Sequence, residues 1–251
     1  MIIHAVTFDC WGTLLLDSPA SDERYRDRRL AGVQRILKTI GVEVPRPELN
    51  RAYEASARWL ARTWQERRDV PVREHVHEIL RRLDPTLPER LGSTLLSALT
   101  EAYAKPALLA SPELDRGAVS ALETLASRGL AIGVVSNVMR TPGSVLRQIF
   151  DRSGLLASMK VLTFSDECGI RKPDPEIFRL TLRQVGVAPE DAVHVGDDPI
   201  LDVEGARAAG MAVIQLAPGG RATAPVKPDA VVSELREVPA ALDRLASTRS
   251  R

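Results

Sequence analysis

The sequence predicts an α/β protein with a Rossmann-like parallel sheet core and an inserted α-helical lobe. Three observations predict this fold. The chain opens with Ile2–Phe8, a short apolar run rich in β-branched residues. Apolar residues then recur at three- and four-residue steps from about Asp22 to Ala110, as helices require. After Pro112, strand-like and helix-like runs alternate, which implies right-handed crossovers and a mostly parallel sheet covered on both faces.

The first two segments differ sharply in periodicity. Ile2–Phe8 is almost continuously apolar, which suits a strand buried on both faces. The helical segment contains breaker-rich stretches that cut it into roughly four helices, enough for a small lobe. These stretches are Gly41–Pro47, Asp69–Pro71 and Asp84–Pro88. We therefore expect a core formed by residues 1–15 and 112–251, and a lobe formed by residues 16–111.

The remaining elements follow from alternating patterns after Pro112. The predicted helices are Glu113–Ser127, Gly143–Phe150, Pro175–Val185, Leu201–Ala209 and Leu235–Leu245. The predicted strands are Ala131–Ser136, Lys160–Phe164, Ala192–Val195, Ala212–Leu216 and Ala230–Val232. Glycines at positions 129, 186 and 210 follow three of the helices, where helices commonly end.

Composition excludes several classes of function. The 251 residues include 34 Lys and Arg against 33 Asp and Glu, so the net charge is only +1. Nucleic acid and membrane are therefore not expected as partners. Arginines interleaved with acidic residues along the helices are interpreted as solvated faces. Cys10 and Cys168 have no metal-ligand spacing and are interpreted as packing residues. Without a signal-peptide pattern, we expect a cytoplasmic protein, monomeric or homodimeric, that acts on a small molecule.

Chemically active residues follow four of the predicted strands. They are Asp9, then Ser136 and Asn137, then Lys172, and finally Asp197, Asp198 and Asp202. In parallel α/β sheets the binding site lies beyond the carboxyl ends of the strands. The sequence therefore predicts that these side chains meet at one edge of the sheet.

This set of residues suits substitution by a carboxylate nucleophile. An aspartate can attack phosphorus or an activated carbon and form a covalent intermediate that water hydrolyses. Attack on a phosphate requires positive charge, which Lys172 and a Mg²⁺ held by carboxylates would supply. Asp9 and Asp197, with Asp198 or Asp202, fit Mg²⁺. Ser136 and the turn at Trp11–Thr13, where Gly12 permits close approach, would hold phosphoryl oxygens.

The motifs resemble those of the haloacid dehalogenase-like superfamily, and the resemblance extends over essentially the whole chain. The matching motifs are Phe8–Leu14, Ser136-Asn137, Lys172–Pro175, and Gly196-Asp197 with Asp202. The resemblance implies that the helical lobe is a cap between the first and second motifs. It implies Asp9 as nucleophile, Lys172 as a catalytic residue, and Trp11, Gly12, Thr13, Ser136 and Asn137 as substrate-binding residues. It also implies Mg²⁺ as cofactor, held by Asp9, the backbone carbonyl of Trp11, Asp197, Asp198 and Asp202.

The chain departs from the pattern of these phosphatases at Trp11. They usually carry a second aspartate at this place, which protonates the leaving oxygen, and tryptophan cannot transfer that proton. The related 2-haloacid dehalogenases carry a tyrosine there and work without metal. The acidic fourth motif instead favours Mg²⁺ and phosphate. Three functions therefore remain, in this order: a phosphatase, a metal-independent dehalogenase, and a weakly active or non-catalytic binding protein.

Several further interpretations remain open. Asp198 is interpreted either as a metal partner or as the cap of a helix that starts at Pro199. The lobe offers Trp59, Arg62, Trp64 and Arg67 as substrate contacts, with core packing or solvation as the alternative. His75 and His77 are candidate proton donors or structural residues. Hinges between lobe and core are expected at Leu15–Ala20 and Ala110–Pro112.

Overall fold

A six-stranded parallel sheet forms the centre of the core and confirms the predicted fold class. The computed structural model describes residues 2–16, 18–219 and 226–248. The strand order is β5-β4-β1-β6-β7-β8, so β1 lies between β4 and β6, which are distant from it in sequence. The strands are β1 (Ala5–Phe8), β4 (Ala131–Ser136), β5 (Val161–Phe164), β6 (Ala192–Gly196), β7 (Ala212–Leu216) and β8 (Ala230–Val232).

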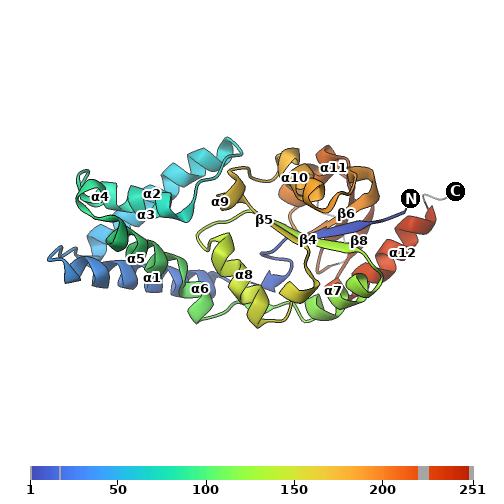
Figure 1. Ribbon diagram of the computed structural model, residues 1–251, viewed down its shortest axis with the longest axis horizontal. Helices are drawn as coiled ribbons and strands as arrows, with labels where there is room; N and C mark the ends of the chain where they lie inside the picture. The colour runs from blue at the N-terminus through green and yellow to red at the C-terminus, as the bar shows by residue number, and fades with distance from the viewer. Residues whose placement is uncertain (1, 17, 220–225, 249–251) are drawn as a thin grey trace.

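Helices cover both faces of this sheet. Successive strand residues point to opposite faces, so each strand contributes side chains to the packing on both sides. Ala5 packs with Phe178 and Ala206 on one face, whereas Val6 and Phe8 belong to the larger core on the other. Figure 1 shows α10 and α11 on one side of the sheet, and α7 and α12 on the other. Their bounds are α7 (Ala118–Ser127), α8 (Gly143–Arg152), α10 (Pro175–Val185), α11 (Gly205–Ala209) and α12 (Val238–Thr248).

A helical region is inserted after the first strand, as the periodicity predicted. We call its helices α1–α5 the cap, and it projects away from the sheet (Figure 1). The helices are α1 (Pro19–Thr39), α2 (Arg46–Gln65), α3 (Val72–Leu83), α4 (Leu87–Arg90) and α5 (Ser93–Ala104), with α6 (Pro106–Leu109) leading back to the core. A reciprocal capping box between Ser18 and Ser21 starts α1. No helix in the described residues is long and apolar enough to cross a membrane.

The two chain crossings between core and cap are hydrogen-bonded to each other. Strands β2 (Leu15–Leu16) and β3 (Glu113–Leu114) pair antiparallel. The predicted helix over Glu113–Ser127 was therefore wrong in its first residues, since α7 begins only at Ala118. The residues of β3 do not by themselves predict this pairing, because it depends on a partner strand almost 100 positions away in the sequence. The hinge positions and the exact domain boundaries stay predictions, and residue 17 of the first hinge lies outside the described residues.

Two smaller predictions were also wrong, and one short helix was not predicted. The strand predicted over Ile2–Phe8 is shorter in the structure. It begins at Ala5, and Ile2 is exposed and does not pair with a neighbouring strand. The predicted helix over Leu201–Ala209 is divided into a wider helical turn, Pro199–Glu204, followed by α11. A short helix, α9 (Ser165–Cys168), follows β5 where no element was predicted, and it ends at Gly169 in the left-handed conformation.

Candidate active site

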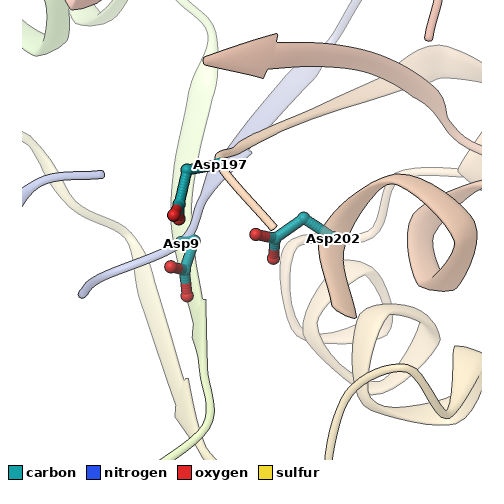
Figure 2. Close-up of side chains that lie close together, drawn as sticks. All are labelled: Asp9, Asp197 and Asp202. Carbon is teal, nitrogen blue, oxygen red and sulfur yellow. The ribbon is translucent and has the colours of Figure 1, made fainter. Parts of the chain in front are cut away.

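Three carboxylates meet at the carboxyl edge of the sheet. Asp9 follows β1, Asp197 follows β6, and Asp202 lies in the helical turn after it. One oxygen of each lies within 4.8 Å of the others, and Figure 2 shows the three side chains lying close together. The topology explains this, since β1 and β6 are parallel neighbours in the middle of the sheet. The structure therefore brings together three of the predicted metal ligands.

Lys172 bridges two of these carboxylates. Its Nζ donates to Oδ1 of Asp9 and, at 2.6 Å, to Oδ1 of Asp202. Burial alone would lower the pKa of Lys172, but the charges of Asp202 and Asp9 raise it above its ordinary value. The lysine is therefore charged at neutral pH and compensates one of the three negative charges that surround it.

Asn137 holds Lys172 in this place. The Lys172 backbone N–H donates to Oδ1 of Asn137 at 2.8 Å, and Asn137 Nδ2 donates to the Lys172 carbonyl at 3.0 Å. Asn137 was predicted to bind substrate. The structure gives its side chain both of these backbone partners, and the residue also lines the cavity described below. Its first role is therefore to position the lysine.

The three carboxylates influence one another's ionisation. Burial raises the pKa of Asp9 to about 7, against the charge of Lys172, with smaller upward contributions from Asp202 and Asp197. Burial and Asp202 raise the pKa of Asp197 to about 6. Burial acts in the same direction on Asp202, but Lys172 and His194 hold its pKa below the usual value. Three carboxylates with one ammonium leave excess negative charge, and this oxygen donor set fits Mg²⁺.

His194 supports the cluster and was not singled out from the sequence. This buried residue of β6 places Nε2 3.1 Å from Oδ1 of Asp202 and Nδ1 2.8 Å from Oγ1 of Thr7. Burial lowers the pKa of His194, so the ring is neutral. The histidine therefore orients Asp202. The available signal was a pair of polar residues, Thr7 and His194, at matching positions of two buried strands.

The turn after β1 supports Asp197. Gly12 has a φ of +81°, and a Cβ at this position would lie 2.6 Å from the carboxylate of Asp197, so the turn requires glycine. Thr13 Oγ1 donates to Oδ1 of Asp197 at 3.3 Å. The backbone amides of this turn were predicted to hold phosphoryl oxygens, and this stays a prediction. In the structure Thr13 binds the aspartate, and Gly12 leaves room for it.

Asp198 and Ser136 have local partners. Oδ1 of Asp198 accepts from the backbone N–H groups of Ile200 and Leu201, both at 2.8 Å. Of its two interpretations, the structure thus shows the helix cap, and Asp198 is not among the three clustered carboxylates. Ser136 is fully buried, and its hydroxyl lies 3.4 Å from the carbonyl of Asn137. Ser136 does not line the cavity.

A cavity of about 690 Å³ opens in front of the carboxylates. The core contributes Asp9, Trp11, Lys172 and Asp202 to its wall, and the cap contributes one face of α1 together with Tyr53 of α2. The α1 face consists of residues at helical spacing, namely Asp22, Arg26 and Arg29. This size suits a small metabolite.

Of the two interpretations of the four candidate cap residues, the structure favours packing and solvation over substrate contact. Trp59, Arg62, Trp64 and Arg67 do not line the cavity. Trp64 instead donates from Nε1 to Asp69 at 3.0 Å, under the guanidinium of Arg171, and both Arg62 and Arg67 are exposed. The periodicity located α2, but it could not tell which cap helix faces the core. Arg29 and Arg140, which do line the cavity, were missed.

The two candidate histidines do not reach the cavity either. His75 is fully buried, edge-on to Tyr103 with ring centroids 6.1 Å apart. Burial, aided by Arg140 and Arg29, lowers the pKa of His75 to about 3, so the ring is neutral at pH 7 and does not act as an imidazolium acid. His77, on α3, is not among the lining residues either. Neither histidine replaces the acid that is missing at Trp11.

Comparison with known proteins gives a consistent result. The family model for haloacid dehalogenase-like hydrolases matches residues 3–210. A phosphoserine phosphatase of Thermus thermophilus is 41% identical over 112 residues, which are 44% of this chain and 44% of that protein. A glyceraldehyde 3-phosphate phosphatase of Methanopyrus kandleri is 28% identical over 87% of this chain and 85% of that protein. The crystal structure of a 2-haloacid dehalogenase from Pseudomonas syringae pv. Tomato DC3000 superposes with a TM-score of 0.71 at 27% identity, over 97% of this chain and 100% of the other.

Proposed function

Because the chain belongs to the haloacid dehalogenase-like hydrolase family, we propose that it is a Mg²⁺-dependent phosphatase that hydrolyses a small phosphorylated metabolite through Asp9. One observation carries the proposal: Asp9, Asp197 and Asp202 present oxygens within 4.8 Å of one another. Crowded carboxylates repel one another and any anionic substrate unless a cation lies among them. The phosphatases among the relatives support the same assignment.

The nucleophile is Asp9. Its carboxylate oxygen bonds to phosphorus while the bond between phosphorus and the ester oxygen breaks, and the leaving group departs with the electron pair. Water then attacks phosphorus in the aspartyl phosphate, which releases inorganic phosphate and restores the carboxylate. Lys172 touches Asp9 and offsets the charge that gathers on the phosphoryl oxygens. Asp9, Asp197 and Asp202 would hold Mg²⁺, which would supply further positive charge to the site.

Trp11 determines which leaving groups suit this site. No carboxylic acid stands two residues after Asp9, where these phosphatases place one to protonate the departing oxygen. Missing general-acid catalysis costs about 10²–10⁴-fold in rate. We therefore propose that acyl phosphates and phosphoanhydrides, whose leaving groups need no proton, react faster than alkyl phosphates of similar size.

A second candidate function is hydrolytic dehalogenation of a 2-haloacid. Two observations favour it: the likeness to the Pseudomonas syringae dehalogenase over 97% of the chain, and the aromatic residue Trp11. Halide leaves without protonation, so this chemistry needs no acid at position 11. This reaction needs no metal, however, so no cation would offset the repulsion among the carboxylates of Asp9, Asp197 and Asp202. The phosphatase therefore ranks first.

The test is a panel of acyl phosphates and phosphate monoesters, each assayed for phosphate release with Mg²⁺ and with EDTA. We expect Mg²⁺-dependent release by the wild-type protein and its loss in Asp9→Asn. Metal-independent chloride release from 2-chloropropionate, without phosphate release from any compound, would establish the dehalogenase instead. Activity that survives in Asp9→Asn would exclude Asp9 as the nucleophile for either reaction.

A further inference from the structure

Two arginines in the cavity wall differ from the others in their partners. Arg29 of α1 is only 5% exposed, and Arg140 lies in the core loop after β4. Both line the cavity that Asp9 faces. Among the residues that the structure describes, no ion pair joins either guanidinium to an acidic side chain. Two other arginines of the same wall are paired: Arg26 with Glu54 at 3.1 Å and Arg171 with Asp69 at 2.6 Å.

Neutral groups from both domains hold these two guanidinium groups in place. Arg29 donates to the Tyr103 carbonyl at 3.1 Å and to Oγ1 of Thr141 at 3.0 Å. Arg140 donates to the Tyr103 hydroxyl, and its guanidinium lies 3.9 Å from the ring centroid of Tyr53. Arg29 thus reaches from cap to core, and Arg140 from core to cap. A charge buried among neutral groups is costly unless an anion balances it.

The charged groups around Arg29 and Arg140 are consistent with an anion-binding role for these arginines. His75, behind Tyr103, has its pKa lowered to about 3 by burial and then by the charges of Arg140, Arg29 and Arg171. The exposed residues Asp22 and Glu23 also line the cavity. Because of these acidic groups, the local charge balance favours a ligand that brings one negative charge over a second phosphate dianion.

We propose that Arg29 and Arg140 form an anion subsite that binds a carboxylate carried by the substrate, so that the preferred substrates are phosphorylated carboxylic acids. The planar guanidinium matches the two oxygens of a carboxylate. The phosphoryl group would lie at Asp9 and the carboxylate at the arginines, within one cavity of about 690 Å³. The assignment of the phosphoryl group as the reacting end of the substrate rests on the proposed phosphatase function. The affinity of the arginines for the carboxylate can be measured without turnover.

Binding to a non-reacting variant tests the subsite directly. Calorimetry would measure the Kd of 2-phosphoglycolate and of 2-hydroxyethyl phosphate for Asp9→Asn in the presence of Mg²⁺. The two ligands are of similar size and differ in the carboxylate. Hydrogen bonds to charged groups predict about 10- to 100-fold tighter binding of 2-phosphoglycolate. Equal affinity, or no binding of 2-phosphoglycolate, would overturn the proposal.

Arginine variants then locate the subsite. Adding Arg29→Gln or Arg140→Gln to Asp9→Asn should reduce the preference for 2-phosphoglycolate about tenfold or more, and Arg29→Lys should retain part of it. Arg28→Gln is the matched control, since Arg28 is the adjacent, exposed residue of α1. It should leave the preference unchanged. If Arg29 and Arg140 only tied cap to core, both ligands would weaken by the same factor and the ratio would not move.

Turnover by the wild-type protein separates the two proposals. Failure to release phosphate from any compound, together with a persistent preference for 2-phosphoglycolate in binding, would overturn the phosphatase and leave the subsite standing. Phosphate release with kcat/KM at least as high for 2-hydroxyethyl phosphate would support the phosphatase and overturn the subsite. If Arg29→Gln fails to fold, the proposal is still tested by Arg140→Gln and by the preference of Asp9→Asn for 2-phosphoglycolate over 2-hydroxyethyl phosphate.

Discussion

At the scale of single residues, Lys172 contributes both to the stability of the fold and to the proposed chemistry at Asp9. Its ammonium group forms ion pairs with two buried carboxylates at once, Asp9 and Asp202. Removing one partner of a buried ion pair leaves an uncompensated charge and costs about 3–5 kcal/mol. We expect Lys172→Met to lower the free energy of unfolding by about 3 kcal/mol in urea denaturation without Mg²⁺.

Two further variants check this interpretation. Adding Asp9→Asn to Lys172→Met should recover part of the lost stability, because it removes one of the charges left unpaired. Lys160→Met, at an exposed position, should have little effect. Equal destabilisation by both lysine variants would contradict the compensating role of Lys172.

Trp11 allows a gain-of-function experiment at the same scale. Because Trp11 lines the cavity beside Asp9, a carboxylic acid there could protonate a leaving oxygen. We expect Trp11→Asp to raise the rate on glycerol 3-phosphate relative to acetyl phosphate by about tenfold or more. Trp11→Asn has nearly the same shape and cannot donate an acidic proton. A similar change of the ratio in both variants would show that removing the indole, rather than acid catalysis, is responsible.

At the scale of elements, the acid Asp166 of α9 lies at the start of α8. Both of its carboxylate oxygens lie 3.3 Å from the backbone nitrogen of Gly143. Burial raises the pKa of Asp166 to about 7. The folded protein therefore favours the protonated acid. This contribution to stability is complete below about pH 4 and is lost as the pH rises through about 7.

Asparagine imitates the protonated acid at every pH. We therefore expect Asp166→Asn to be more stable than the wild type at pH 8, by about 2 kcal/mol, and the difference to vanish near pH 4. Thermal unfolding at the two pH values measures it. Asp151→Asn, exposed on α8, is the control. A stability difference that did not depend on pH would refute the assignment.

The element scale also shows why sequence reasoning reached some parts of the molecule and missed others. Asp9, Lys172, Asp197 and Asp202 could be predicted to meet because the carboxyl ends of parallel strands share one edge. The β2–β3 pair could not, since each strand has only two residues and its partner is far away in sequence. Arg29 was hidden for a related reason. It belongs to a helix of interleaved charges that resembles a solvated face, and only packing shows which side is buried.

At the scale of the whole molecule, a cap loop is fastened to the core beside the active site. The loop between α2 and α3 exchanges backbone hydrogen bonds with the segment before Lys172: Asp69 N–H to the Gly169 carbonyl and Arg171 N–H to the Arg67 carbonyl, both 2.9 Å. The buried ion pair between Asp69 and Arg171 completes the connection. The cap therefore touches the segment that carries Lys172, the proposed catalytic lysine.

Breaking this ion pair should loosen the cap. We expect Asp69→Asn to lower the free energy of unfolding by about 3 kcal/mol and to speed amide hydrogen exchange at Gly169 and Arg171. Arg68→Ala, which removes an exposed pair with Glu66, is the control and should do neither. Unchanged exchange in Asp69→Asn would show that the backbone contacts hold the loop without the ion pair.

The covalent intermediate tests the central claim most directly. Wild-type protein mixed with acetyl phosphate and Mg²⁺, quenched in acid within one turnover and digested, should yield a peptide containing Asp9 that carries one phosphoryl group. Asp9→Asn and an EDTA-treated sample should yield the unmodified peptide. An unmodified Asp9 peptide during rapid phosphate release would contradict the account, as would an ester on Asp9 formed from 2-chloropropionate without metal.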